Sequence, residues 1–160
     1  MPPTAETRAR VRFRDARHKD LEAIIRLLAA DSLGIWRESL GDGALPEAYR
    51  IAFDAIERDP NNRIIVGEID SKTIACLQLT FIPGLTYSGG TRAQIEGVRV
   101  DAELRGAGIG RALIEHAISL AREKPCVLVQ LTTDKRRAEA LAFYQALGFT
   151  ASHEGMKLRF

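Results

Sequence analysis

The residues best suited to chemistry in this chain form a glycine-rich segment, RGAGIG, at residues 105–110, between a strand-like and a helix-like segment. The first N–H groups of a helix have no partner inside the helix, and the helix dipole favours negative charge at that end. Glycine lets the backbone approach an anion closely. The segment therefore predicts a cradle for a phosphate group, although a glycine turn of this kind can also serve only as a turn.

Two common nucleotide-binding motifs do not fit this segment. The P-loop requires Lys followed by Ser or Thr directly after its last glycine, and Gly110 is followed by Arg111. The dinucleotide motif G-x-G-x-x-G requires a third glycine three places after Gly108, where Arg111 stands. The spacing excludes a P-loop nucleoside triphosphatase and a Rossmann dehydrogenase.

Positive charge gathers at the starts of two predicted helices, with Arg105 and Arg111 at one and residues 135–137 (KRR) at the other. A cation at a helix N-terminus is unfavourable by roughly 0.3–1 kcal/mol. A bound polyanion would offset this cost, because Arg pairs well with phosphate oxygens; the alternative is a solvated basic helix end. The net charge of +2 is too small to indicate nucleic-acid binding.

The elements that must position these residues follow from hydrophobic periodicity. Amphipathic helices are predicted at residues 20–28, 46–58 and 135–147, with a further helix running from the glycine segment to residue 121. Strands are predicted at residues 11–14, 64–69, 73–82, 94–100, 126–131 and 156–160, with a hairpin turn at 70–72 and a mobile connection at 83–90. The strand at 126–131 is the most continuously apolar and is expected to be central. This order predicts an α/β (α+β) domain with a mixed sheet and helices on both faces.

Length and composition fit one domain of 160 residues, with residues 1–9 expected to be a flexible tail. No apolar run approaches the roughly 20 residues of a membrane span, and no signal-peptide pattern is present, so a cytoplasmic protein is expected. Cys76 and Cys126 lie in apolar runs, which is typical of buried thiols rather than of a disulfide or a metal site.

The glycine segment resembles the signature [Q/R]-x-x-G-x-[G/A] of the GCN5-related N-acetyltransferase (GNAT) superfamily. The preceding strand Ile95–Val100 and the closing segment Ala140–Phe149 also resemble the family's pattern. The resemblance implies a single domain with a mixed, mostly antiparallel sheet. It also implies an enzyme that transfers an acetyl group from acetyl-CoA, its co-substrate, to an amine.

The resemblance further implies which residues contact the cofactor. The backbone of residues 98–100 would pair with the pantetheine arm, and the N–H groups of residues 106–111 would hold the pyrophosphate. Arg137 stands where many relatives carry Asn, and it would contact a CoA phosphate or an anionic acceptor. The expected cofactor-binding residues are Val98, Arg99, Val100, Arg105, Gly106, Ala107, Gly108, Ile109, Gly110, Arg111 and Arg137.

Two residues are the catalytic candidates. An amine is mostly protonated at pH 7, so transfer requires a base. Strand alternation would place Glu96 on the face of Val98 and Val100, where it could act directly or through one water; the alternative is an exposed Glu or an ion pair with Arg92. The N–H of Val98 is a candidate oxyanion donor. Tyr144, which matches the family's tyrosine beside the CoA sulfur, would protonate or hydrogen-bond the leaving thiolate. No cysteine occupies a matching position, which favours direct transfer in a ternary complex.

The acceptor is expected to be the primary amine of a small molecule. The stretches ending at 81–84 and covering 132–137 resemble the aminoalkylphosphonate acetyltransferases, so an acidic acceptor fits.

His18 and His116 are expected to be solvated, and His153 is a candidate for the acceptor site. Alternatives are a protein lysine or N-terminal acetyltransferase and a non-catalytic acyl-CoA-binding module. A homodimer without nucleic-acid or membrane partners is expected. Segments that line the acceptor cleft in the family would contribute Trp36, Arg37, Phe81, Tyr87 and Arg92, of which Trp36 and Phe81 could equally be core.

Overall fold

A computed structural model describes residues 5–30, 38 and 44–160. Five strands form one sheet in the order β1-β2-β3-β4-β5. Neighbouring strands are antiparallel except for β4 and β5, which are parallel. The strands are β1 (Arg12–Asp15), β2 (Asn62–Ile69), β3 (Lys72–Ile82), β4 (Arg92–Val100) and β5 (Leu128–Leu131).

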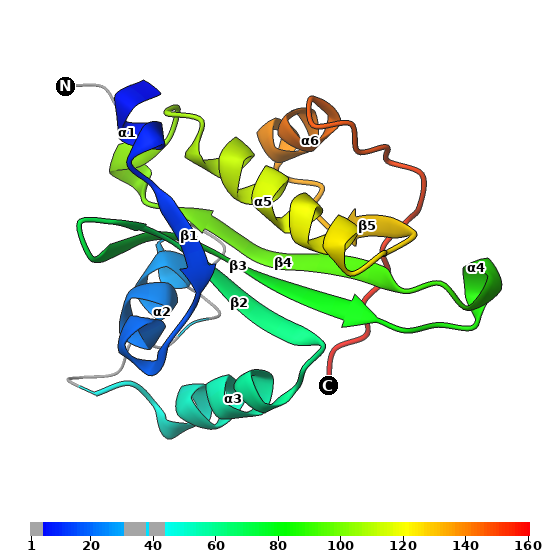
Figure 1. The fold of residues 1–160 in the computed structure, drawn as a ribbon, viewed down its shortest axis with the longest axis horizontal. Coiled ribbons are helices and arrows are strands. Elements are labelled where there is room, and N and C mark those ends of the chain that lie inside the picture. The colour runs from blue at the N-terminus through cyan, green and yellow to red at the C-terminus, as the bar shows by residue number, and fades with distance from the viewer. Residues whose placement is uncertain (1–4, 31–37, 39–43) are drawn as a thin grey trace.

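Helices cover both faces of this sheet (Figure 1). Helix α5 packs against β3 and β4 on one face, and α2 and α3 lie on the other. This arrangement confirms the predicted α/β domain with a mostly antiparallel sheet. The helices are α1 (Ala5–Ala9), α2 (Leu21–Ala29), α3 (Glu47–Arg58), α4 (Thr86–Gly89), α5 (Ile109–Glu123) and α6 (Ala138–Gln145), with short 3-10 turns η1 (His18–Asp20) and η2 (Ala102–Leu104).

The main core lies between α5 and the sheet. Alternate residues of β3 and β4, such as Leu79 and Ile95, pack with Leu113 and Ile114 of α5, and all four are almost fully buried. A smaller cluster joins α2 to the opposite face through Val66 and Cys76, among others. Burial of these apolar side chains is the main favourable term that holds the helices on the sheet.

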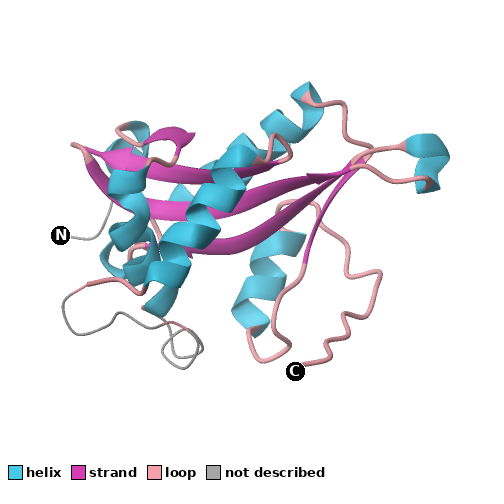
Figure 2. Cartoon of the chain, turned by 90° about the horizontal axis from the view of Figure 1, so that it is seen from below, coloured by secondary structure: helices cyan, strands magenta, loops and turns pink. Residues whose placement is uncertain are grey.

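The predicted helices at 20–28 and 46–58 and the hairpin at 64–82 are confirmed, with boundaries shifted by a few residues. The hairpin turn uses Asp70 and Ser71, whose φ angles of 47° and 67° are those of a primed turn that matches strand twist. The expected connection at 83–90 contains α4, which projects away from the rest of the molecule (Figures 1 and 2). The N-terminal segment expected to be a tail carries α1.

Two strand predictions are wrong in position or existence. The 126–131 strand begins at Leu128 and lies at the edge of the sheet rather than at its centre, because β4 is its sole neighbour among the described strands. Residues 156–160 form no strand, and Met156 and Leu158 are 94% and 82% exposed. Alternation predicts a strand only if an edge is available to pair with it, and the sequence does not show the edge.

Candidate active site

Strand β4 carries a bulge directly after the candidate base, Glu96. Cys76 pairs with Arg99 and Gln78 pairs with Glu96. Two residues of β4, Gly97 and Val98, therefore face the single residue Leu77 of β3. Gly97 has a φ of +62°, which glycine adopts without strain. The bulge therefore interrupts the alternation of side chains along β4.

Because of this bulge, Glu96 does not share a face with Val98 and Val100, contrary to the prediction from strand alternation. Val98 and Val100 pack into the core beneath α5, as Ile95 does, so Glu96 lies on the opposite face, toward α2. The glutamate is exposed there. No ion pair joins Glu96 to Arg92 within the described residues. Glu96 thus lies on the other face of β4 from Val98 and Val100.

The far edge of β4 is only partly used by β5. The parallel pairing between them runs from Arg92↔Leu128 to Ile95↔Leu131 and then stops. Within the described residues, no strand pairs with that edge from Glu96 to Val100, although the Val98 carbonyl accepts a hydrogen bond from the Arg99 side chain at 2.8 Å. An unpaired strand edge of this kind can bind an extended ligand.

The glycine loop leads from this strand into α5. Gly106 and Gly108 have φ angles of +85° and +79°, and Gly108 is the N-cap of α5. No backbone or side-chain acceptor among the described residues pairs with the N–H groups of residues 106–111, and the first turn of α5 has no acidic residue. Unpaired N–H groups at a helix start are what an anion cradle requires, and the binding role of this loop stays a prediction. A Cβ at Gly110 would lie 3.6 Å from Phe143 and 3.7 Å from Val100, so α6 and β4 both lie close to the loop at this residue.

The cations near the two helix starts differ in their partners. Arg105 is exposed, and Arg111 bonds to Glu115 and to the carbonyl of Ala146 at 3.5 and 3.3 Å. At the second helix start, Lys135 pairs with Glu154 at 2.6 Å and Arg136 pairs with Asp134 at 2.8 Å. Local carboxylates therefore account for these two cations. The Asp134 turn also delays α6, which begins at Ala138 rather than at residue 135.

Tyr144 lies in α6 with its ring against Phe143 and Phe149, at centroid distances of 5.1 and 5.9 Å. Burial raises the pKa of Tyr144, while the positive charges of Arg99 and Arg137 act to lower it. Arg99 comes from β4 and Arg137 is the N-cap of α6. The fold therefore brings the Tyr144 phenol close to the part of β4 that β5 leaves unpaired, residues 96–100. At neutral pH the hydroxyl is a proton donor.

A comparison with protein-family models matches residues 22–149 to the acetyltransferase (GNAT) family. The chain belongs to this family. It is therefore an N-acetyltransferase, and its co-substrate is acetyl-CoA.

Relatives of this acetyltransferase carry different names. Over 87 residues it is 36% identical to glucosamine 6-phosphate N-acetyltransferase of Trypanosoma brucei brucei, covering 54% of this chain and 57% of the relative. Over 145 residues it is 27% identical to peptidyl-lysine N-acetyltransferase YjaB of Salmonella typhimurium, covering 87% and 83%. A solved structure described as a transcriptional regulator from Bacillus halodurans C-125 is 49% identical, with a TM-score of 0.91 over 94% of this chain and 99% of that one. The match spans little more than half of the first relative, and the named acceptors differ.

Several residues predicted to line the acceptor cleft of the acetyltransferase lie in the core, in α4 or outside the described residues. Phe81 is buried in the core beneath α5, with the Lys124 ammonium over its ring, so it does not line an acceptor cleft. Trp36 and Arg37 lie outside the described residues, and Tyr87 is exposed in α4. His18 is exposed, as expected, and lies near Asp54. His153 is also exposed, beside Ser152.

His116 and the cysteines take no part in this site. His116 is stacked on Phe13 at 5.3 Å rather than solvated, and burial lowers its pKa. Both cysteines are free, and burial raises the pKa of Cys76 to about 12, so that thiol is no nucleophile at neutral pH.

No group of His, Cys, Asp and Glu within the described residues could hold a metal ion. Among these residues, no helix has the length and apolarity needed to cross a membrane.

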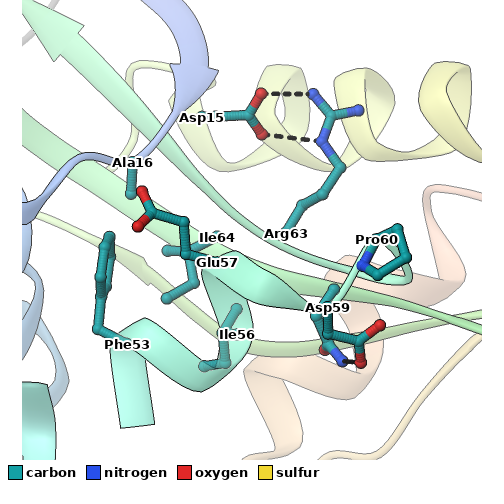
Figure 3. A pocket seen from close by; sticks show the side chains of 10 residues that line it. Asp15, Ala16, Phe53, Ile56, Glu57, Asp59, Pro60, Arg63 and Ile64 are labelled. Atoms are coloured by element: carbon teal, nitrogen blue, oxygen red, sulfur yellow. Dashed lines mark hydrogen bonds and ion pairs between the residues drawn. The ribbon is translucent and has the colours of Figure 1, made fainter. Parts of the chain in front are cut away.

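A surface pocket of about 270 Å³ lies between α3, β1 and β2 (Figure 3). Its charged residues include Arg63, which forms two hydrogen bonds with Asp15 at 2.8 and 2.9 Å, and this pairing raises the pKa of Arg63. No candidate catalytic or cofactor-binding residue lines the pocket. We therefore assign it no part in catalysis or in binding acetyl-CoA.

Sequence reasoning missed two features near the site. Arg8 of α1 lies beside Gly108, about 3.4 Å from the position a Cβ would take there. Polar side chains of β2, β3, β4 and β5 also gather on one face of the sheet, next to Glu96. Neither leaves a local sequence signal, because the contacting residues are far apart in the chain.

Proposed function

We propose that this enzyme transfers the acetyl group directly from acetyl-CoA to the primary amine of a small molecule, in a ternary complex. The observation that supports the proposal is the edge of β4 from Glu96 to Val100, which β5 leaves unpaired and which leads into the glycine loop. Val98 and Val100 of this segment pack against the same core cluster as Tyr144. Direct transfer is supported by Cys76, which is buried and protonated and so unsuited to hold an acetyl group.

The acceptor class can be tested by measuring thiol release from acetyl-CoA with a panel of amines. We expect small amines, such as amino sugars or polyamines, to give higher kcat/KM than peptides with a lysine or a free N-terminus. The relative named for glucosamine 6-phosphate supports this expectation, and the relative named for peptidyl-lysine is the reason for including peptides. A peptide as the best acceptor would contradict the proposal.

The cofactor-binding roles are part of the proposal. The backbone of residues 98–100 would pair with the pantetheine arm, and the N–H groups of residues 106–111, which include Ala107, Ile109 and Gly110, would hold the pyrophosphate. The left-handed glycines and the open N–H groups of the loop fit such an anion. Arg105, Arg111 and Arg137 would supply positive charge around it.

Two glycines provide a matched test of the loop. Gly106 and Gly148 have φ angles of +85° and +91°, and a Cβ at either would meet no atom within 4 Å. Gly106→Ala and Gly148→Ala should therefore each lower the free energy of unfolding by about 1 kcal/mol. Acetyl-CoA at 100 times its Kd should stabilise the native enzyme by about 2.7 kcal/mol, which calorimetry or fluorescence reads as a rise in Tm. We expect Gly148→Ala to keep this rise and Gly106→Ala to lose most of it. Equal rises in both variants would remove Gly106 from the cofactor site.

We propose that Glu96 takes the proton of the amine, directly or through one water, while the Val98 N–H donates to the thioester oxygen as negative charge develops. Glu96→Gln should lower kcat/KM roughly 10-fold at neutral pH, because glutamine cannot accept the proton. The loss should shrink as the pH rises and the amine deprotonates by itself. Glu103→Gln, which also neutralises an exposed glutamate, serves as the control. Superimposable pH profiles of wild type and Glu96→Gln would exclude the base.

We also propose a homodimer. Met156, Leu158 and Phe160 are exposed and alternate with charged residues as a strand would, and a second copy could cover them. Light scattering should give a mass near twice 17.7 kDa. Leu158→Lys should shift the mass toward that of the monomer. A monomeric wild-type enzyme would contradict this part of the proposal.

A further inference from the structure

The face of the sheet toward α2 and α3 carries a patch of polar side chains. Because Leu79, Ala93 and Ile95 point into the core beneath α5, the residues that alternate with them lie on the opposite face. Figure 2 views the molecule from this side, with β3 and β4 continuing beyond the helices toward α4. We define the polar sheet face as Asn62, Gln78, Thr80, Arg92, Gln94 and Gln130.

The helices leave this face accessible. Helix α2 packs over Val66 and Cys76, and Phe53 of α3 packs near Ile64. Every residue of the polar sheet face is partly exposed instead. Glu96 continues the face along β4, since it pairs with Gln78. The face therefore adjoins the position at which the amine of an acceptor would lose its proton.

Hydrogen bonds between strands hold these side chains in place. Asn62 accepts from Gln78 at 3.1 Å and from Thr80 at 2.6 Å, and Gln130 donates to Gln94 at 2.7 Å. Each amide carries more donors and acceptors than these bonds use. A ligand with several hydroxyl groups could bond to the remaining groups, whereas a hydrocarbon amine would leave them unsatisfied.

Arg92 adds a positive charge at one end of the face. Its Nε is buried, no described residue accepts a hydrogen bond from that atom, and the side chain forms no ion pair within the described residues. Arg14 and Arg63, by contrast, are paired with carboxylates. A buried donor without an acceptor costs free energy, which a bound anion would recover.

The spacing along β4 fits a small ligand. Arg92 and Glu96 are four residues apart, which corresponds to roughly 13 Å of strand. Both side chains are long enough to lean toward each other, and a ligand held between them would then span less than this backbone distance. An amine placed at Glu96 could thus carry an anion that reaches Arg92.

We propose that the polar sheet face binds the acceptor, and that the acceptor is a small hydroxylated amine bearing an anionic group, which pairs with Arg92. This inference rests on the proposed function. The anionic group is a phosphate, which offers the oxygen pair that a guanidinium binds.

The experiment compares hydroxylated amines that differ by one phosphate: glucosamine with glucosamine 6-phosphate, and galactosamine with galactosamine 6-phosphate. In at least one pair, we expect the wild-type enzyme to give about 10-fold higher kcat/KM for the phosphorylated amine. Arg92→Gln should lower kcat/KM for that amine by about 10- to 100-fold, the range for a charge-assisted hydrogen bond, and change that of its neutral partner less than about 3-fold. Arg122→Gln, an exposed arginine of α5, is the control and should preserve the preference.

The inference is overturned if neither phosphorylated amine is preferred, or if Arg92→Gln lowers kcat/KM of both members of a pair equally. Binding of acetyl-CoA separates this failure from that of the proposed function. A rise in Tm with acetyl-CoA and turnover of another small amine would leave the proposed function standing. Turnover of peptides alone would reject both.

Discussion

Replacing Tyr144 with phenylalanine should lower kcat about 100-fold, which is the scale on which a positioned general acid contributes. The variant removes one hydroxyl and leaves the ring against Phe143 and Phe149, so the packing of α6 should persist. KM for acetyl-CoA should change little, because the proposed binding groups of the glycine loop are untouched. Steady-state kinetics with acetyl-CoA varied at saturating amine measures both quantities.

The pH dependence of kcat provides a second test of Tyr144. Since burial raises the pKa of Tyr144, the wild-type phenol should remain a proton donor to a higher pH than an ordinary tyrosine. Tyr49→Phe is a matched control, because it deletes a phenol whose hydroxyl bonds to Glu38 at 3.1 Å. Equal kcat values for wild type and Tyr144→Phe would exclude Tyr144 as the acid and leave it a packing role.

The parts of the fold that the sequence predicted are those determined by local patterns. Helices α2, α3 and α5 each present an apolar stripe, and the β2–β3 hairpin has turn residues between two apolar runs. The position of β5 could not be predicted in this way, because strand order depends on pairing between distant segments. A continuous apolar run indicates burial, and α5 supplies that burial at the edge of the sheet.

The candidate site was predicted residue by residue but not in its orientation. The glycine loop and Tyr144 could be found from a motif, whereas the placement of Val98 and Val100 on the face opposite Glu96 depended on the bulge at Gly97. A glycine inside a strand is a known signal for a bulge, and it was the available clue. The polar sheet face was beyond prediction, because the partners Asn62, Thr80, Gln94 and Gln130 come from four different strands.

Asp20→Asn should lower the free energy of unfolding by about 3 kcal/mol, the range for breaking a buried ion pair. Asp20 is 4% exposed and accepts hydrogen bonds from Arg14 at 2.7 and 3.0 Å, from the Arg17 N–H at 2.8 Å and from Thr73 at 3.0 Å. Asparagine keeps the shape but cannot accept all four of these hydrogen bonds, and it removes one of the two carboxylates that pair with Arg14, the other being Glu68. Urea unfolding monitored by circular dichroism measures the loss.

The same residue should govern stability in acid. Burial by itself would raise the pKa of Asp20, but the hydrogen bonds from Arg14, Arg17 and Thr73 outweigh it and lower the pKa to about 2, against 3.8 ordinarily. A carboxyl with a lowered pKa in the folded state stabilises the fold above its ordinary pKa, and this stability is lost as the pH falls toward the folded value. The contribution of Asp20 should therefore disappear between about pH 4 and pH 2, and Asp20→Asn should lack this part of the acid transition.

Asp15→Asn is the matched control, because it breaks an arginine–carboxylate pair of similar geometry that is exposed. Asp15 and Arg63 are 60% and 33% exposed, so their pair should be worth less than about 1 kcal/mol. Equal losses in the two variants would contradict the importance of burial at Asp20. The difference matters for function as well, since Asp20 ties the start of α2 to β1 and β3, and Leu28 of α2 lies 3.5 Å from where a Cβ on Gly97 would be. Loosening α2 should disturb the bulge that places Val98 and Val100 on the face opposite the proposed base Glu96, so Asp20→Asn should also lower kcat/KM, and Asp15→Asn should not.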